Sequence, residues 1–396
     1  MISFSQYLTE AISTEGKVSH IAHPEDRPLI NGAKGFEHAK GALNQASEHI
    51  KSGKKDKSLT MKYDGSPAIV FGHHPKTGKF FVATKSAFNK NPKINHTPED
   101  IERNHGHAPG LVQKLKDALT HLPKVTPKKG VYQGDMMFSH HDVVHNPNGS
   151  TSFTPNTITY SAHGQEANKV KKAKVGVVVH QQYHGRDIGD MKASPEIEHK
   201  FRQHPDVWHK TAEHDTRIIN YGDKAQQEFH KHMDAAQKIH DEHKKTMYAA
   251  TEPHQGASGH LATYINQTVR NNAKPTVRGL QQHVMDKSQI VQSRLKTTKA
   301  AEEKQRGAQQ EINHINKHAS SYENLLKMHQ HIQKAKNVLV KTLNQHPGTL
   351  SHHIEGKETH PEGYVVNHKN EPTKLVDRAE FSRANLMRNR KPNANV

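Results

Sequence analysis

The sequence predicts an α+β fold, and three observations support this. Residues 59–85 and 131–180 contain short β-branched and aromatic runs separated by polar turns, a pattern typical of strands. From about residue 190 to 345 the apolar residues recur every three or four positions, which indicates amphipathic helices. Strand-like runs return after Pro347. We therefore expect sheets that are interrupted by an all-helical segment.

These changes divide the chain into three segments. Residues 1–189 are expected to form the first part of a sheet domain, and residues 190–345 a helical insert of three or four long helices. Residues 346–396 then add the final strands and a C-terminal helix. The apolar stripes of the insert are typical of a bundle core rather than of a cofactor site.

The N-terminal residues predict helices rather than a targeting signal. Residues 3–11 and 35–51 have amphipathic patterns, and residues 20–31 between them indicate a loop rich in Pro and His. The first ten residues carry neither a basic lead nor a continuous apolar core, so we expect no signal peptide. No run approaches the roughly 20 apolar residues of a membrane span. We therefore expect a soluble, cytoplasmic protein without a membrane partner.

Residues 59–72 are expected to form a β-hairpin that presents one lysine. Leu59–Met61 and Ala68–Phe71 are strand-like, and Asp64-Gly65 gives the chain a place to reverse. Lys62 lies at the end of the first strand, where its amine could attack an electrophilic phosphate if neighbouring cations or partial burial kept it unprotonated. The alternative is a hairpin with a simple solvated lysine.

The next elements are predicted from their ends and their periodicity. Thr97 is a suitable N-cap for a helix at 97–104, with Pro98 at the first helical position. The nearly continuous apolar run at 175–180 indicates a central strand. The remaining predicted elements are a helix at 111–122 and strands at 79–85, 131–138, 157–161, 363–368 and 372–376.

The composition points to a polyanionic partner. The chain carries 57 Lys and Arg against 39 Asp and Glu, a formal charge of +18, and its 36 His add positive charge at mildly acid pH. Nucleic acid is the commonest polyanion. Aromatic residues make up only 6%, which favours phosphate contacts over base stacking. The alternative is that the charge serves only solubility. The absence of cysteine excludes disulfides and thiolate sites.

Four strand-borne motifs follow one another in a recognisable order. They are Lys62-Tyr63-Asp64-Gly65, Tyr132-Gln133-Gly134-Asp135, Glu362-Gly363-Tyr364-Val365-Val366 and Lys374-Leu375. Together they resemble the motifs of the covalent nucleotidyltransferase superfamily, which includes ATP-dependent RNA and DNA ligases and capping enzymes. This resemblance is confined to the two strand-rich segments of the chain and says nothing of the helical insert. The N-terminus is also similar to those of proteins encoded by large tailed phages, which implies the cytoplasm of an infected host cell.

The resemblance implies a role for each motif. Lys62 would form a phosphoramide with AMP and release pyrophosphate, with Asp64 and Gly65 completing its nucleotide-binding motif. Lys374 would contact the α-phosphate and help to keep Lys62 unprotonated. Glu362 would bind Mg²⁺, and Asp135 the ribose hydroxyls or the water shell of the metal. The alternative for each of these residues is that it is an ordinary strand-edge or surface group without a role in catalysis.

The sequence also departs from the family pattern. The arginine usually found one strand after the attachment lysine is absent, and Lys85 is the nearest substitute. Asp135 replaces the more usual glutamate, and Val177 and Val179 occupy the stretch where an adenine-stacking aromatic is expected. Adjacent histidines such as His73-His74 and His140-His141 do not indicate a zinc site, because neighbouring residues of a strand face opposite sides.

These inferences lead to one expected function and two alternatives. The expected function is an ATP- and Mg²⁺-dependent polynucleotide ligase that joins 5′-phosphate to 3′-hydroxyl ends. RNA is the first choice of substrate, because the stretch from Lys374 to Val396 is too short for the oligonucleotide-binding barrel of DNA ligases. The basic helical insert would then hold the nucleic acid. The alternatives are a nick-sealing DNA ligase and a non-catalytic nucleic-acid-binding or virion-associated protein that keeps the fold.

Overall fold

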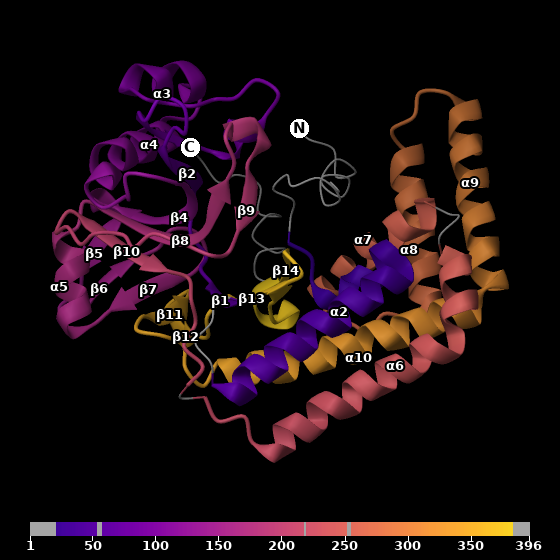
Figure 1. Cartoon of the computed structure of the whole chain (residues 1–396). Helices are drawn as coiled ribbons and strands as arrows, with labels where there is room; N and C mark the ends of the chain where they lie inside the picture. The colour runs from indigo at the N-terminus through magenta and orange to yellow at the C-terminus, as the bar shows by residue number, and fades with distance from the viewer. Residues whose placement is uncertain (1–20, 54–57, 218, 252–254, 383–396) are drawn as a thin grey trace.

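The fold is α+β, as predicted. The computed structural model describes residues 21–53, 58–217, 219–251 and 255–382. Figure 1 shows a β-rich part and an elongated helical arm, with a small sheet where the two meet. The helix predicted at residues 3–11 and the basic tail lie outside the described residues.

A six-stranded sheet forms the centre of the β-rich part. Its order is β10-β8-β4-β2-β3, with β9 paired to β8, and the β8–β10 pair is parallel while the others are antiparallel. The predicted central strand, β8, does lie between two neighbours. The six strands are β2 (Ala68–His73), β3 (Phe80–Ala83), β4 (Val131–Ser139), β8 (Val175–His184), β9 (Lys192–Ser194) and β10 (Val207–Thr211).

Helices and a second sheet cover this sheet. Helices α3 (Pro98–His105) and α4 (Pro109–His121) pack on one core, which includes Ile101 and Leu115. The Thr97 cap of α3 is confirmed, because its hydroxyl accepts from Asp100 N at 3.2 Å. Helix α5 (Gly164–Lys172) lies over the five-stranded sheet β12-β11-β7-β6-β5. That sheet contains β5 (Val143–His145), β6 (Thr151–Phe153), β7 (Thr159–Ala162), β11 (Ser351–Ile354) and β12 (Lys357–Thr359).

The small sheet corrects the prediction of a lysine hairpin. Strand β1 (Leu59–Lys62) does not pair with β2 but runs antiparallel to β13 (Gly363–His368), which in turn pairs with β14 (Glu371–Leu375). The chain between β1 and β2 therefore crosses from one sheet to another. Local turn signals could not reveal this, because the true partner of β1 follows the whole helical segment in the sequence.

The helical arm shares its core with the small sheet. Buried residues of the arm such as Phe36, Phe229 and Tyr322 belong to the same apolar cluster as Leu59 and Tyr364 of the strands. The arm is therefore packed on the small sheet, whose strands carry three of the four motifs. Its helices are α2 (Arg27–Ser52), α6 (Asp223–Thr251), α7 (Gln255–Asn271), α8 (Val277–Gln292), α9 (Thr298–Lys317) and α10 (Ala319–Leu343).

Two local predictions were wrong. Residues 20–31 were expected to form a loop, but a 3₁₀ turn at Pro24–Asp26 leads directly into α2, which begins at Arg27. Pro28 suits the first turn of a helix, and the non-helical backbone at Gly32 interrupts α2 near its start, so only one short turn precedes the break. The segment after residue 190 was expected to lack strands, yet β9 and β10 lie there and the first long helix of that segment begins at Asp223.

Several histidines of the arm are buried or half-buried, which disfavours their protonation. Burial, followed in most cases by neighbouring cations, lowers the pKa of His232, His260, His283 and His331, in His283 to about 4. His283 is 4% exposed and bonds to Thr263 Oγ1 at 2.7 Å. Burial therefore disfavours the charged form of these four side chains, so each would add less positive charge at mildly acid pH than an exposed histidine.

We therefore expect the folded chain to lose stability as the pH falls below about 6.5. A histidine whose pKa is lower in the folded state binds its proton more readily in the unfolded chain, so acid favours unfolding. The stability contribution of such a histidine is therefore complete above about pH 6.5 and declines as the pH falls towards about 4. Each such group contributes at most about 1.4 kcal/mol per pH unit. Urea unfolding at pH 7.5, 6.0 and 5.0 measures this. Equal free energies of unfolding at all three values would contradict it, and His283→Gln should reduce the slope.

Candidate functional site

Lys62 and Glu362 meet directly, although they lie on separate segments of the chain. Lys62 ends β1 and is aligned with Gly363 of β13, so the residue before β13 lies beside it. Lys62 Nζ is 2.5 Å from Glu362 Oε2, and the two side chains are 30% and 10% exposed. The first and third predicted motifs thus form one ion pair at the edge of the small sheet.

The ion pair with Glu362 determines the charge of Lys62. Burial alone would lower the pKa of the Lys62 amine, but Glu362 outweighs it, with smaller contributions from Asp135 and Asp64, so the pKa is raised. Burial also raises the pKa of Glu362, against the opposing charge of Lys62. The close contact and the partial exposure of Lys62 favour the charged pair over two neutral groups. Lys62 is therefore an ammonium group at neutral pH.

Lys374 is the second lysine of the site and differs from the first. It lies on β14 and is aligned with Val365 of β13. Within the part of the chain that the structure describes, its Nζ forms no hydrogen bond or ion pair. Burial and the charge of Lys62 lower its pKa to about 8. The proximity of the two lysines thus lowers the pKa of Lys374, whereas the sequence had led us to expect a lowered pKa for Lys62.

Asp64 and Gly65 shape the turn that follows Lys62. The Asp64 carboxylate accepts hydrogen bonds from Asn156 Nδ2 at 2.8 Å and from the amides of Thr157 and Ile158 at 2.7 and 3.0 Å. A Cβ on Gly65 would lie 2.4 Å from Asp135 Cβ, a distance that only glycine avoids. Asp64 therefore anchors a loop, and Gly65 lets the turn approach β4 closely.

Asp135 and Lys85 complete the predicted set. Asp135 lies on β4 between Ala68 and Val178, with its Oδ1 3.6 Å from His180 Nε2. Lys85 begins the 3₁₀ turn η2 (Lys85–Phe88), and burial lowers its pKa against the opposing charge of Asp135. His180 was not predicted as a site residue, although its position at the end of the apolar run 175–179 could have indicated it.

The site thus gathers charged groups from all four motifs. Lys62, Glu362 and Lys374 interact electrostatically with one another, and Asp135 acts on both Lys62 and Lys85. Val177 and Val179 belong to the core beneath α4, so this stretch supplies no aromatic ring for a base. The arrangement can present an amine, further cations and carboxylates to a phosphorylated ligand.

Comparison with known proteins assigns a family but no activity. Residues 18–390 match the model described as Family of unknown function (DUF6267). The chain belongs to the DUF6267 family. No curated protein and no solved structure matches it. The match includes both the motif residues and the helical arm, so the DUF6267 family is defined over the two parts together.

The carboxylates of this DUF6267 member suit a cation that is shared with a ligand. Among the described residues no group of three or more His, Asp or Glu is arranged to hold a metal ion. Glu362 and Asp135 are hard oxygen donors from two different sheets. Mg²⁺ is often held by one or two carboxylates together with substrate phosphates and water. The donor set fits that mode of binding and not a metal cage made of protein groups alone.

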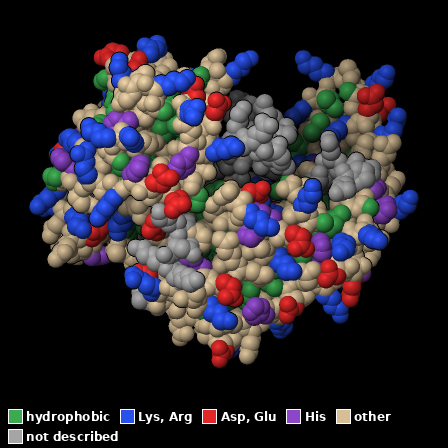
Figure 2. All heavy atoms as spheres, viewed as in Figure 1, with side chains coloured by type: hydrophobic (Ala, Val, Ile, Leu, Met, Phe, Trp, Pro, Cys, Tyr) green, Lys and Arg blue, Asp and Glu red, His purple; other side chains and the backbone are tan. Residues whose placement is uncertain are grey.

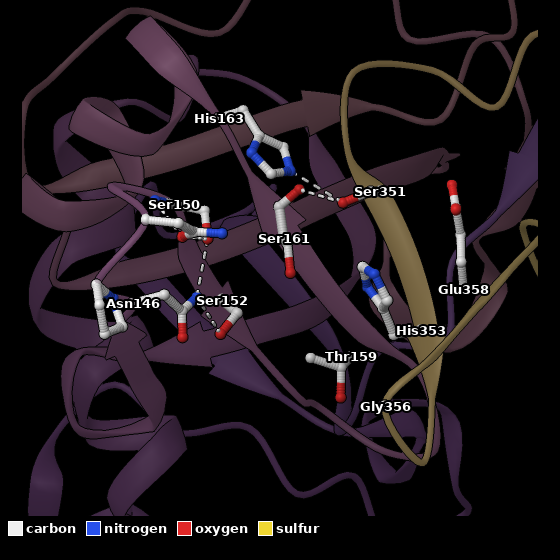
Figure 3. A pocket seen from close by; sticks show the side chains of 12 residues that line it. Asn146, Ser150, Ser152, Thr159, Ser161, His163, Ser351, His353, Gly356 and Glu358 are labelled. Carbon is white, nitrogen blue, oxygen red and sulfur yellow. Dashed lines mark hydrogen bonds between the residues drawn. The ribbon is translucent and has the colours of Figure 1, made fainter.

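Other surface features of the DUF6267 chain are separate from this site. A polar hollow of about 680 Å³ on the five-stranded sheet is lined by Ser161, His163, Ser351 and other residues, among them no lysine or arginine (Figure 3). Its chemistry does not suit a polyanion. Figure 2 shows Lys and Arg side chains scattered over both parts of the visible face, interspersed with Asp and Glu. No described helix is long and apolar enough to cross a membrane.

Proposed function

We propose that this chain is an ATP-dependent polynucleotide ligase acting through a lysine–AMP intermediate, with RNA ends as the first choice of substrate. The observation that carries the proposal is the meeting of Lys62, Glu362, Lys374 and Asp135. These residues come from four separate motifs and from two different sheets. An arrangement of independent surface residues would give no reason for these four groups to lie close enough to act on one another.

The proposed chemistry begins at the Lys62 amine. Lys62 has to leave Glu362 and lose a proton, because an ammonium group has no electron pair with which to attack. The amine then attacks the α-phosphorus of ATP, so that a nitrogen–phosphorus bond forms and pyrophosphate leaves. A 5′-phosphate oxygen next displaces the Lys62 amine from AMP. Finally a 3′-hydroxyl attacks the activated 5′-phosphate, and AMP is released.

The other residues act on charge and position. Lys374 would contact the α-phosphate, where a cation offsets the negative charge that grows during the attack. Glu362 and Asp135 would hold Mg²⁺, which neutralises charge on the ATP phosphates when it is bound. His180 Nε2 lies 3.6 Å from Asp135 Oδ1 and would help to orient that carboxylate, while the charge of Asp135 also acts on Lys85.

Retention of radiolabel tests the proposal directly. The full chain incubated with Mg²⁺ and ATP labelled at the α-phosphate should keep the label after denaturation, whereas ATP labelled at the γ-phosphate should leave none. Joining of 5′-phosphorylated RNA then separates an RNA ligase from an enzyme that seals nicked DNA. Nucleic-acid binding without retained label would instead assign the chain to the non-catalytic alternative.

A further inference from the structure

A buried cluster of charges lies beside the strand that carries Lys374. Lys336 Nζ is 2.6 Å from Glu25 Oε1, and both side chains are fully buried. Arg378 Nη1 is 2.7 and 2.8 Å from the two oxygens of Asp26, and His329 Nε2 is 3.1 Å from Asp26 Oδ1. None of the sequence motifs indicated this cluster.

The cluster joins the helical arm to the end of the small sheet. Glu25 and Asp26 lie in the 3₁₀ turn η1 (Pro24–Asp26), and Lys336 lies on α10. Arg378 begins the short helical turn after β14 and also donates to Asn266 of α7 at 2.7 Å. Two carboxylates face two cations, so the cluster is balanced in formal charge. Removing one member would leave a buried charge without its partner.

The backbone on both sides of Lys374 is tied to this cluster. Lys374 N donates to Ala22 O at 3.0 Å, and Ala22 forms a parallel bridge with Thr373. Asp26 follows Ala22 by four residues, and Arg378 follows Lys374 by four residues. The ion pair between Asp26 and Arg378 therefore closes a ring of contacts around the second lysine of the site.

Charged groups from several elements face the Lys374 amine. Lys62 of β1 and Arg378 disfavour its charged form, while Asp26 and Glu362 favour it. His23 lies near the same amine; its ring is buried, and its Nδ1 has no hydrogen-bond partner in the described structure. Burial, and after it the charge of Lys374, lowers the pKa of His23, which keeps that ring neutral.

We propose that Asp26 and Arg378 are positioning residues for Lys374, and that the cluster couples this lysine to the helical arm. The inference rests on the proposed function only in taking Lys374 as a phosphate contact. The negative charge of Asp26 offsets the positive charges of Lys62 and Arg378 near the Lys374 amine. Because Arg378 pairs with Asp26, it limits how strongly Asp26 can favour a charged Lys374. A movement of α10 against the small sheet would change the surroundings of Lys374 through the same contacts.

Competitive acetylation of the full chain tests this without relying on enzymatic activity. Acetic anhydride modifies only the unprotonated amine, so the labelling of Lys374, followed by mass spectrometry from pH 6 to 10, reports its titration midpoint. Asp26→Asn should lower this midpoint by on the order of one pH unit. Arg378→Gln should move it in the opposite direction. Asp187→Asn, which removes a carboxylate from an exposed pair with Lys76, should leave it unchanged.

The two opposite shifts separate positioning from a merely structural role. Folding of each variant is checked by circular dichroism, and either folded variant suffices because each has its own predicted sign. A folded variant with the wild-type midpoint, or two variants shifted in the same direction, overturns the proposal. If neither variant folds, the cluster serves stability alone. Shifts of the predicted sign in a chain that never retains AMP would support the positioning and refute the ligase function.

Discussion

Replacing Lys62 by alanine should abolish the attachment of AMP. The amine is the group that would bond to the α-phosphorus, and alanine offers no nucleophile. Lys62→Arg should be equally inactive, because a guanidinium group is not deprotonated in proteins. Both are measured as label from α-labelled ATP that stays on the denatured chain. Attachment at the wild-type level in either variant would show that another residue is the nucleophile.

The same substitution should change stability only moderately. Removing one partner of a fully buried ion pair lowers the free energy of unfolding by about 3–5 kcal/mol. Lys62 is 30% exposed, so water can reach the Glu362 carboxylate that remains, and the cost should be smaller. Lys76→Ala is a suitable control, because Lys76 likewise pairs with a carboxylate, that of Asp187, but lies at an exposed position. It should leave AMP attachment unaltered.

Replacing Glu362 by glutamine should slow AMP attachment by orders of magnitude while ATP still binds. The lost carboxylate matters most as charge develops on the phosphates, where a neutral amide offers no comparable stabilisation. The pH profile should change as well. Without its partner, Lys62 loses its proton more readily, so the rise of the remaining rate with pH should begin at a lower pH than in the wild type.

These two effects distinguish a catalytic Glu362 from a structural one. Single-turnover rates of attachment between pH 6 and 9 measure both, with ATP affinity followed separately by calorimetry. Glu358→Gln is a matched control, since this glutamate lies on β12 in a different sheet. A Glu362→Gln variant that attaches AMP as fast as the wild type would refute the role of the carboxylate.

The sequence predicted element types better than it predicted their partners. Helix α3 has clear end signals in Thr97 and Pro98, and β8 is a long apolar run, so both could be placed from local residues alone. The pairing of β1 with β13 could not, because nothing near Lys62 encodes a partner on the far side of the helical segment. The short strands β5, β9 and β12 have three residues each, too few to show a period.

The proximity of the candidate site residues could be predicted from the motifs, but their electrostatics could not. Motif order identified Lys62, Asp135, Glu362 and Lys374, which the structure brings together. Their charge states depend on burial and on distances between side chains, which a sequence does not contain. The cluster around Asp26 was missed for a related reason, because its residues are spread from η1 to the turn after β14 and share no local pattern.

The pairing of β1 with β13 also has a consequence for the order in which the protein is made. Lys62 leaves the ribosome long before Glu362 and Lys374 are synthesised, so β1 remains unpaired until its partner β13 has been made. Contacts between residues so far apart in sequence form late and slow the folding of a domain. A chain whose translation stops before residue 362 therefore cannot assemble the site, so a truncated product would lack the proposed activity.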